Sequence, residues 1–128
     1  MKFKSFLAKP FASYIYRQVK KDMANALEDQ QKIFQDLLKT GVKTSFGADH
    51  KMAEIKTYEA FKQAIPIRDY EQYKPYIEQI KQGKHNVLWK GQPIYFAKTS
   101  GTTSGIKYIP ITNDSIPNHI NTARNALL

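Results

Sequence analysis

The chain has 128 residues, 41% of them hydrophobic and 24% charged, which fits one globular domain and excludes an intrinsically disordered chain. It contains no cysteine and no apolar stretch near the roughly 20 residues of a membrane span, so we exclude a disulfide framework and a membrane-spanning helix and expect a soluble, cytoplasmic protein. The formal net charge is +9, and six basic residues with no acidic one lie at or before Lys21, which favours a solvated terminal helix over a nucleic-acid site.

A long helical segment is predicted from Phe11 to Thr40, because apolar residues recur there every three or four positions, as on one face of a helix. Pro10 suits a helix start and Gly41 suits the turn beyond a helix end, so they bound one long helix or two in series. The next segment, Val42–Lys56, has no clear period, and we expect a surface connection.

Two shorter helices are predicted next. The first spans Thr57–Ala64, and Pro66 disfavours helical geometry before it, so the chain is expected to be extended over Ile65–Arg68. Asp69 is the expected N-cap of the second helix, and Gly83 ends it. The apolar residues of this helix share one face: Tyr70, Tyr73, Tyr76, Ile77 and Ile80.

Short strands follow the helices. Val87–Trp89 and Ile94–Ala97 are apolar runs split by turn residues, and Tyr108–Ile111 is a third candidate. Thr112 or Asn113 is the expected cap of a final helix. The predicted class is therefore α+β, with residues 1–84 mainly helical and residues 85–128 forming a strand–loop–strand–helix unit. Because the final helix still runs at the last residue, we expect this chain to be the N-terminal part of a larger domain.

The stretch most informative about function lies between the last two strands, where seven successive residues are Thr, Ser or Gly and a lysine follows. Glycines let backbone N–H groups converge on an anion, hydroxyls add donors at short reach, and lysine supplies a mobile positive charge. Charge-assisted hydrogen bonds of this kind are each worth about 1.5–3 kcal/mol. We therefore predict a phosphate-binding loop made of Thr99, Ser100, Gly101, Thr102, Thr103, Ser104, Gly105 and Lys107.

The loop differs from a Walker loop, in which Gly-Lys is followed by Ser or Thr and then by a helix. Here Ile106 separates the glycine from Lys107, and a strand follows. A flexible Ser/Thr/Gly linker is the alternative interpretation. The apolar strands on both sides disfavour it.

The motif SGTTSGIK, followed by a strand, resembles the phosphate loop of the adenylate-forming superfamily, which includes acyl-CoA synthetases. The wider pattern, AIPIRDYEQYKPYIEQIKQG and then PIYFAKTSGTTSGIKYIPIT, is similar to the Gretchen Hagen auxin-responsive acyl-acid amido synthetases, particularly their bacterial relatives. The resemblance covers nearly all of the chain and is clearest after Tyr58.

This resemblance implies an ATP-dependent, AMP-forming ligase that adenylates a small-molecule carboxylic acid and joins it to an amino acid, with ATP and Mg²⁺ as cofactors of the full-length protein. It implies that residues 99–105 hold the β- and γ-phosphates and that Lys107 neutralises the leaving pyrophosphate. Ser104 and Ile106 depart from the superfamily pattern. Arg124, on the final helix, is a further candidate for contacting the substrate carboxylate. The remaining catalytic parts would lie downstream, so we expect the 128-residue chain alone to be inactive.

Other interpretations remain open. One is another adenylate-forming ligase, such as an acyl-CoA synthetase. Another is a basic module that binds nucleic acid or an anionic surface, although the helical spacing of the tyrosines disfavours a stacking platform. We expect no nucleic-acid or membrane partner, and no metal site, since His50, His85 and His119 are far apart. An exposed strand edge near Tyr95 or Ile109 predicts self-association.

Overall fold

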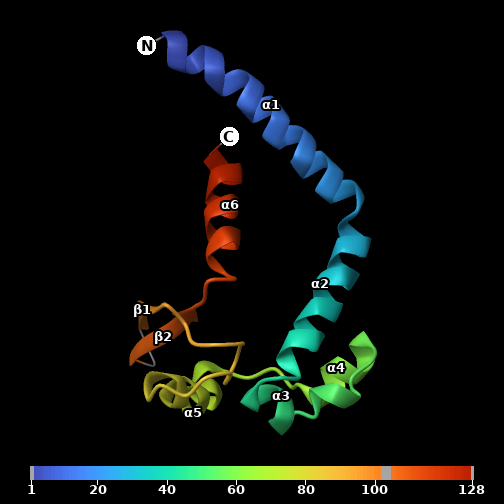
Figure 1. Ribbon diagram of the computed structural model, residues 1–128, viewed down its shortest axis with the longest axis vertical. Helices are drawn as coiled ribbons and strands as arrows, with labels where there is room; N and C mark the ends of the chain where they lie inside the picture. The colour runs from blue at the N-terminus through green and yellow to red at the C-terminus, as the bar shows by residue number, and fades with distance from the viewer. Residues whose placement is uncertain (1, 102–104, 128) are drawn as a thin grey trace.

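The computed structural model describes residues 2–101 and 105–127 (Figure 1). Helices come first, then a two-stranded antiparallel sheet, then a last helix, an arrangement compatible with the predicted α+β class. The elements are α1 (Lys2–Ala24), α2 (Ala26–Gly41), α3 (Ser45–Asp49), the 3-10 helix η1 (Met52–Glu54), α4 (Tyr58–Ala64), α5 (Tyr70–Lys81), β1 (Tyr95–Gly101), β2 (Gly105–Ile111) and α6 (Ile116–Leu127). None of the helices in these ranges is long and apolar enough to cross a bilayer.

The long N-terminal helical segment is two helices in series, α1 and α2, which meet at Asn25. In Figure 1, α1 runs across the top of the molecule, above the end of α6, and leads down to α2 on the right. The expectation that Pro10 starts the helix is wrong, because α1 already begins at Lys2 and continues through the proline. A proline removes one backbone hydrogen bond, and the residues before it are compatible with a helix, so this loss does not end α1.

The segment after α2 was expected to be a surface connection, and the structure corrects this. It forms α3 and η1, and Met52 and Ile55 are buried with Leu38 in a first hydrophobic cluster. Helices of five and three residues are too short to show a period of 3.6 residues in the sequence.

A close turn joins α2 to α3. The Thr44 hydroxyl donates to the Gly41 carbonyl at 2.7 Å and accepts from the Gly47 backbone N–H at 2.9 Å. The Thr44 side chain is only 4% exposed, so both hydrogen bonds are shielded from water. This turn brings Gly47 against the last residue of α2.

A second hydrophobic cluster contains Ile77 and Ile80 of α5 together with Val87, which is 1% exposed. Phe96 and Tyr108 of the sheet pack against it, so the cluster ties α5 to both strands. The predicted strand Val87–Trp89 is wrong, since the residues there are irregular. The Val87 carbonyl instead accepts a hydrogen bond from α3: the Phe46 N–H donates to it at 3.0 Å.

The predicted N-cap of α5 is confirmed, because Asp69 forms a capping box with Gln72. Thr57 was predicted to be the first residue of the shorter helix, and it is the N-cap of α4 instead: its side chain accepts from the Ala60 N–H. Thr112, one of the two predicted caps of the last helix, makes the hydrogen bonds expected of a cap. Its hydroxyl accepts from the Ser115 N–H at 3.3 Å, its own N–H donates to the Ser115 hydroxyl at 3.0 Å, and α6 begins at Ile116.

Candidate phosphate-binding site

The predicted phosphate loop lies at the tip of the β1–β2 hairpin. The strands are antiparallel, with Tyr95 opposite Ile111 at one end and Gly101 opposite Gly105 at the other. Both strands are longer than expected and extend into the loop. Thr99, Ser100 and Gly101 therefore end β1, and Gly105 begins β2. The other three predicted site residues, Thr102, Thr103 and Ser104, lie outside the described residues.

Gly105 has the backbone geometry that favours glycine. Its φ is +73°, in the left-handed region that side-chain-bearing residues rarely adopt. Among the described residues, a Cβ atom at this position would meet nothing within 4 Å, so the constraint that they show is conformational. Gly105 thus begins β2 with a backbone conformation that favours glycine.

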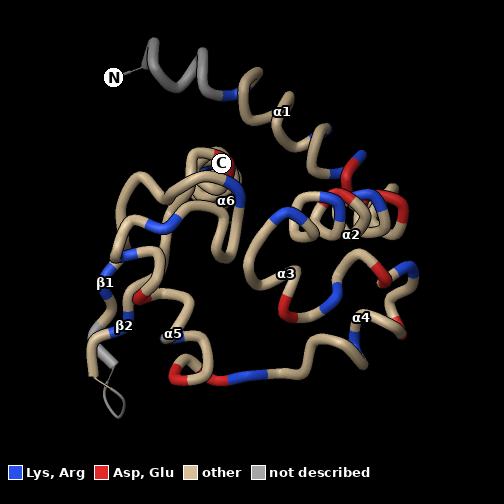
Figure 2. Tube along the Cα trace, turned by 60° about the horizontal axis from the view of Figure 1, so that its bottom comes forward, with Lys and Arg blue, Asp and Glu red and all other residues tan. Residues whose placement is uncertain are grey.

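Lys107 lies directly opposite Thr99 in the sheet, so the two side chains project from the same face. Lys107 is half-buried, and its Nζ lies 5.8 Å from the centre of the Tyr70 ring, in cation–π contact. Each strand carries one lysine, Lys98 or Lys107, and residues 95–111 contain no acidic residue (Figure 2). Thr99 and Lys107 therefore present a hydroxyl group and a positive charge on one face of the hairpin, and Lys98 lies on the other face.

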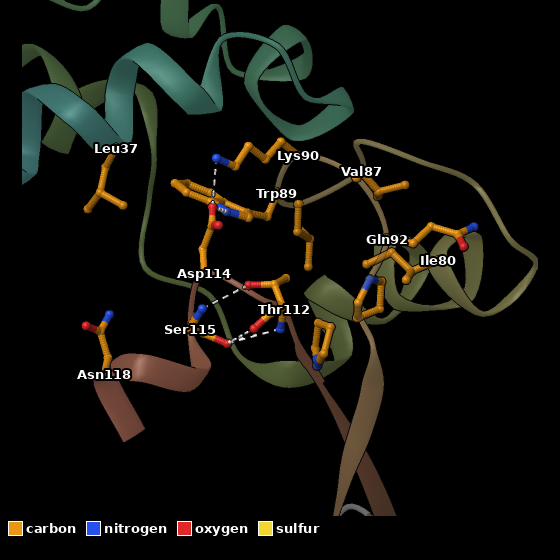
Figure 3. A pocket seen from close by; sticks show the side chains of 14 residues that line it. Leu37, Ile80, Val87, Trp89, Lys90, Gln92, Thr112, Asp114, Ser115 and Asn118 are labelled. Atoms are coloured by element: carbon orange, nitrogen blue, oxygen red, sulfur yellow. Dashed lines mark hydrogen bonds and ion pairs between the residues drawn. The ribbon is translucent and has the colours of Figure 1, made fainter. Parts of the chain in front are cut away.

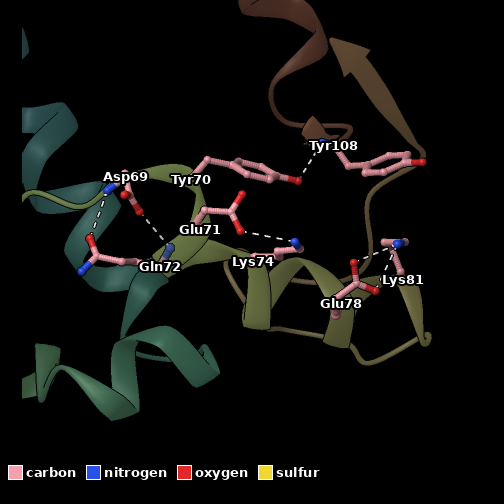
Figure 4. A network of polar contacts seen from close by, with 8 residues as sticks. All are labelled: Asp69, Tyr70, Glu71, Gln72, Lys74, Glu78, Lys81 and Tyr108. Carbon is pink, nitrogen blue, oxygen red and sulfur yellow. Dashed lines mark hydrogen bonds and ion pairs between the residues drawn. The ribbon is translucent and has the colours of Figure 1, made fainter. Parts of the chain in front are cut away.

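Helix α5 supports the hairpin through polar and aromatic contacts (Figure 4). The Tyr108 backbone N–H donates to the Tyr70 hydroxyl at 2.8 Å. Lys81 Nζ lies 4.8 Å from the centre of the Tyr108 ring and 2.9 Å from the Glu78 carboxylate. The pKa of Lys81 is raised, chiefly by this hydrogen bond to Glu78. The sequence did not predict the contact between Tyr70 and Tyr108, because no local pattern links residues 38 positions apart.

A cavity of about 330 Å³ lies beside the hairpin, between α2, the segment before β1 and the start of α6 (Figure 3). Its walls are mostly apolar, and several of its polar groups are bonded to one another. Asp114 accepts from Trp89 Nε1 at 3.0 Å and pairs with Lys90 Nζ at 2.9 Å. Thr112 and Ser115 bond each other in the same wall. These groups hold the elements together and do not mark a ligand.

The Asp114 interactions predict a dependence of stability on pH. The hydrogen bond from Lys90, and secondly that from Trp89, lowers the pKa of the Asp114 carboxyl, against a smaller opposing effect of desolvation. A carboxyl group whose pKa is lowered on folding stabilises the folded protein at pH values above the pKa of the unfolded chain, which is about 4. This stabilisation is lost as the pH falls through the pKa of the folded protein.

We therefore expect Asp114→Asn to lower the melting temperature at pH 7 and to have progressively less effect below about pH 4. Thermal unfolding followed by circular dichroism from pH 7 to pH 2 would measure this. Asp36→Asn, at an exposed residue in the middle of α2, is the matched control and should leave the curve unchanged. A difference between Asp114→Asn and the wild type that stays constant down to pH 2 would contradict the expectation.

Arg124 is placed apart from the hairpin. It is exposed in the last turn of α6, and its Nη2 donates to the Asn125 side chain at 3.3 Å. Helix α6 leads away from the hairpin tip in Figure 1. The described residues contain no cluster of three His, Asp or Glu side chains that could hold a metal ion.

Comparison with known proteins identifies the family. The GH3 family N-terminal domain matches residues 15–128. A probable indole-3-acetic acid-amido synthetase, GH3.13, from Oryza sativa subsp. japonica is 41% identical over 59 residues, which cover 44% of this chain and 13% of that protein. The chain thus aligns with only a small part of its relative's length. The family match over residues 15–128 confirms the predicted resemblance to the Gretchen Hagen proteins: the chain belongs to the GH3 family.

Proposed function

We propose that this chain is the part of an ATP-dependent acid–amino-acid ligase that holds the β- and γ-phosphates of ATP. The observation that carries the proposal is the hairpin geometry. Thr99 and Lys107 face the same side at the base of a tip made of Thr, Ser and Gly, on strands that have no acidic residue. Family membership and the relative's description as an amido synthetase support the reaction class.

In the proposed reaction, a carboxylate oxygen of the acid attacks the α-phosphorus of ATP, and the bond from that phosphorus to the bridging oxygen breaks to release pyrophosphate. The amine of an amino acid then attacks the acyl carbon, so an amide forms, AMP leaves and a proton is released. Residues 99–105 donate hydrogen bonds to the phosphate oxygens, and the Lys107 ammonium offsets the charge that grows on pyrophosphate. These groups position and stabilise, and none of them acts as a nucleophile.

The residues present fit phosphate better than they fit a metal ion. Hydroxyl groups, glycine N–H groups and a lysine are donors for anions. Mg²⁺ prefers carboxylate and phosphate oxygens, and the hairpin has no carboxylate. The phosphates themselves and residues outside this hairpin would supply the ligands of Mg²⁺. Arg124, which lies apart from the hairpin, is proposed to contact the carboxylate of the acid, because its exposed guanidinium is available to an anion.

Acid-dependent exchange of pyrophosphate into ATP tests the proposal, followed by detection of the amide when an amino acid is added. The full-length ligase should catalyse both steps, and the 128-residue chain alone should release no pyrophosphate. Exchange followed by thioester formation with coenzyme A, and no amide with any amino acid, would identify an acyl-CoA synthetase instead. Absence of exchange with every carboxylic acid tried would overturn the proposed function.

A further inference from the structure

We propose that Tyr70 is a positioning residue for the phosphate loop. It fixes the distance between β2 and α5 and the direction of the Lys107 ammonium. This inference rests on the proposed function and assigns a role within it to a residue outside the loop. Two separate contacts of one side chain carry it. The hydroxyl group bonds the backbone of Tyr108, and the ring lies against the side chain of Lys107.

The first contact fixes the outer edge of β2. In an antiparallel pair, the N–H groups of one strand point alternately toward and away from the partner strand. The Tyr108 N–H is directed at the Tyr70 hydroxyl, 2.8 Å away, and so faces away from β1. Pro110 lies two residues further along β2 and therefore on the same edge, and it has no N–H at all. Tyr70 thus supplies the acceptor for an amide that β1 cannot serve, and it does so beside Lys107.

The second contact directs the ammonium of Lys107. Its Nζ lies 5.8 Å from the centre of the Tyr70 ring, and no salt bridge to Lys107 is found among the described residues. A carboxylate in this place would cancel the charge. An aromatic ring holds the cation without neutralising it, so the full charge stays available to an anion at the hairpin tip.

Tyr70 is itself held firmly. It is the first residue of α5, directly after the capping box in which Asp69 accepts from the Gln72 N–H at 3.0 Å and its own N–H donates back to the Gln72 side chain at 3.1 Å. Its ring is half-buried against the second hydrophobic cluster. The capped start of α5 therefore fixes the position of Tyr70, whose hydroxyl contacts β2 at Tyr108 (Figure 4). Through the same side chain it also fixes the position of Lys107.

A double-mutant cycle in the full-length ligase tests this role, with acid-dependent pyrophosphate exchange as the readout. Tyr70→Leu is expected to lower kcat about tenfold and to leave the KM for the acid unchanged. In a Lys107→Ala background the same substitution should cause no further loss of kcat, because its effect acts through the lysine. Equal losses in both backgrounds would overturn the role.

Tyr73→Leu is the matched control. Tyr73 lies one turn further along α5 and stacks on Phe46, with ring centres 5.9 Å apart, rather than on the hairpin. We expect this variant to lower the melting temperature and leave kcat unchanged. If it lowers kcat as much as Tyr70→Leu does, general destabilisation explains both, and the positioning role is overturned.

Amide exchange of Tyr108, followed by NMR in the 128-residue chain, separates this inference from the proposed function. Tyr70→Phe keeps the ring and removes the hydroxyl, so the Tyr108 amide should exchange faster with solvent than in the wild type. Unchanged exchange would overturn the positioning of β2, whatever the activity. If the Tyr108 amide exchanges faster in Tyr70→Phe but the full-length protein shows no pyrophosphate exchange, the positioning of β2 by Tyr70 is supported and only the proposed ligase function is overturned.

Discussion

Replacement of Gly47 by alanine is expected to lower the free energy of unfolding by about 3 kcal/mol or more. A Cβ atom at Gly47 would lie 2.0 Å from the carbonyl oxygen of Gly41 and 2.7 Å from its carbonyl carbon. Both are backbone atoms at the end of α2, and the buried Thr44 hydrogen bonds fix them. Since no side chain can rotate out of the way, α2 and α3 must separate and open the first hydrophobic cluster.

Gly41→Ala is the matched control for this prediction. There the new Cβ would meet the Met52 side chain, with Cε at 2.6 Å and Sδ at 3.0 Å. The end of a methionine side chain is flexible and can move, and alanine favours the helix by up to about 1 kcal/mol over glycine. Urea unfolding of both variants measures the difference. A Gly47→Ala protein as stable as Gly41→Ala would show that the approach of α3 to α2 is not required.

Removing one hydroxyl from the hairpin tip is expected to reduce activity greatly. In the full-length ligase, Ser100→Ala or Thr102→Ala should each lower acid-dependent pyrophosphate exchange by roughly 10²-fold, the usual loss when a donor to transition-state charge is removed. The charge on pyrophosphate grows as the bond breaks, so the loss should fall on kcat more than on the KM for the acid.

Thr122→Ala provides the control, because it removes an exposed threonine hydroxyl from α6 rather than from the loop. Its exchange rate should equal that of the wild type. If both loop variants also keep the wild-type rate, the hairpin tip does not hold the phosphates, and the assignment of residues 99–105 fails.

Patterns confined to a few neighbouring residues were predictable from the sequence. The cap at Asp69 was predicted, because a cap is a local interaction between a side chain and an N–H three residues later. The helical segment Phe11–Thr40 was also predictable from its apolar period, whereas its start at Lys2 and its division at Asn25 were not. The fold of Val42–Lys56 was not, since its short helices depend on distant contacts, such as that between Phe46 and Val87.

The same division holds for the candidate site. The run from Thr99 to Gly105 is contiguous, so its composition, together with the apolar segments on both sides, predicted an anion-binding loop, and that assignment stays a prediction. The support beneath it, which joins Tyr70 to Tyr108 across 38 positions, leaves no local pattern. Trp89 and Asp114 are similarly joined across 25 positions. A sequence shows that such side chains exist, and only the packed chain shows which of them meet.

The outer edge of β2 also determines how this small sheet can grow. A further strand beside Tyr108 and Pro110 would lose two successive backbone hydrogen bonds. The Tyr108 N–H already donates to Tyr70, and Pro110 has no N–H. The free side of β1 carries no such obstacle within Tyr95–Lys98, whose residues are not proline. Any additional strand, from the same polypeptide or from a second copy, is therefore directed to β1, and the hairpin extends in a single direction.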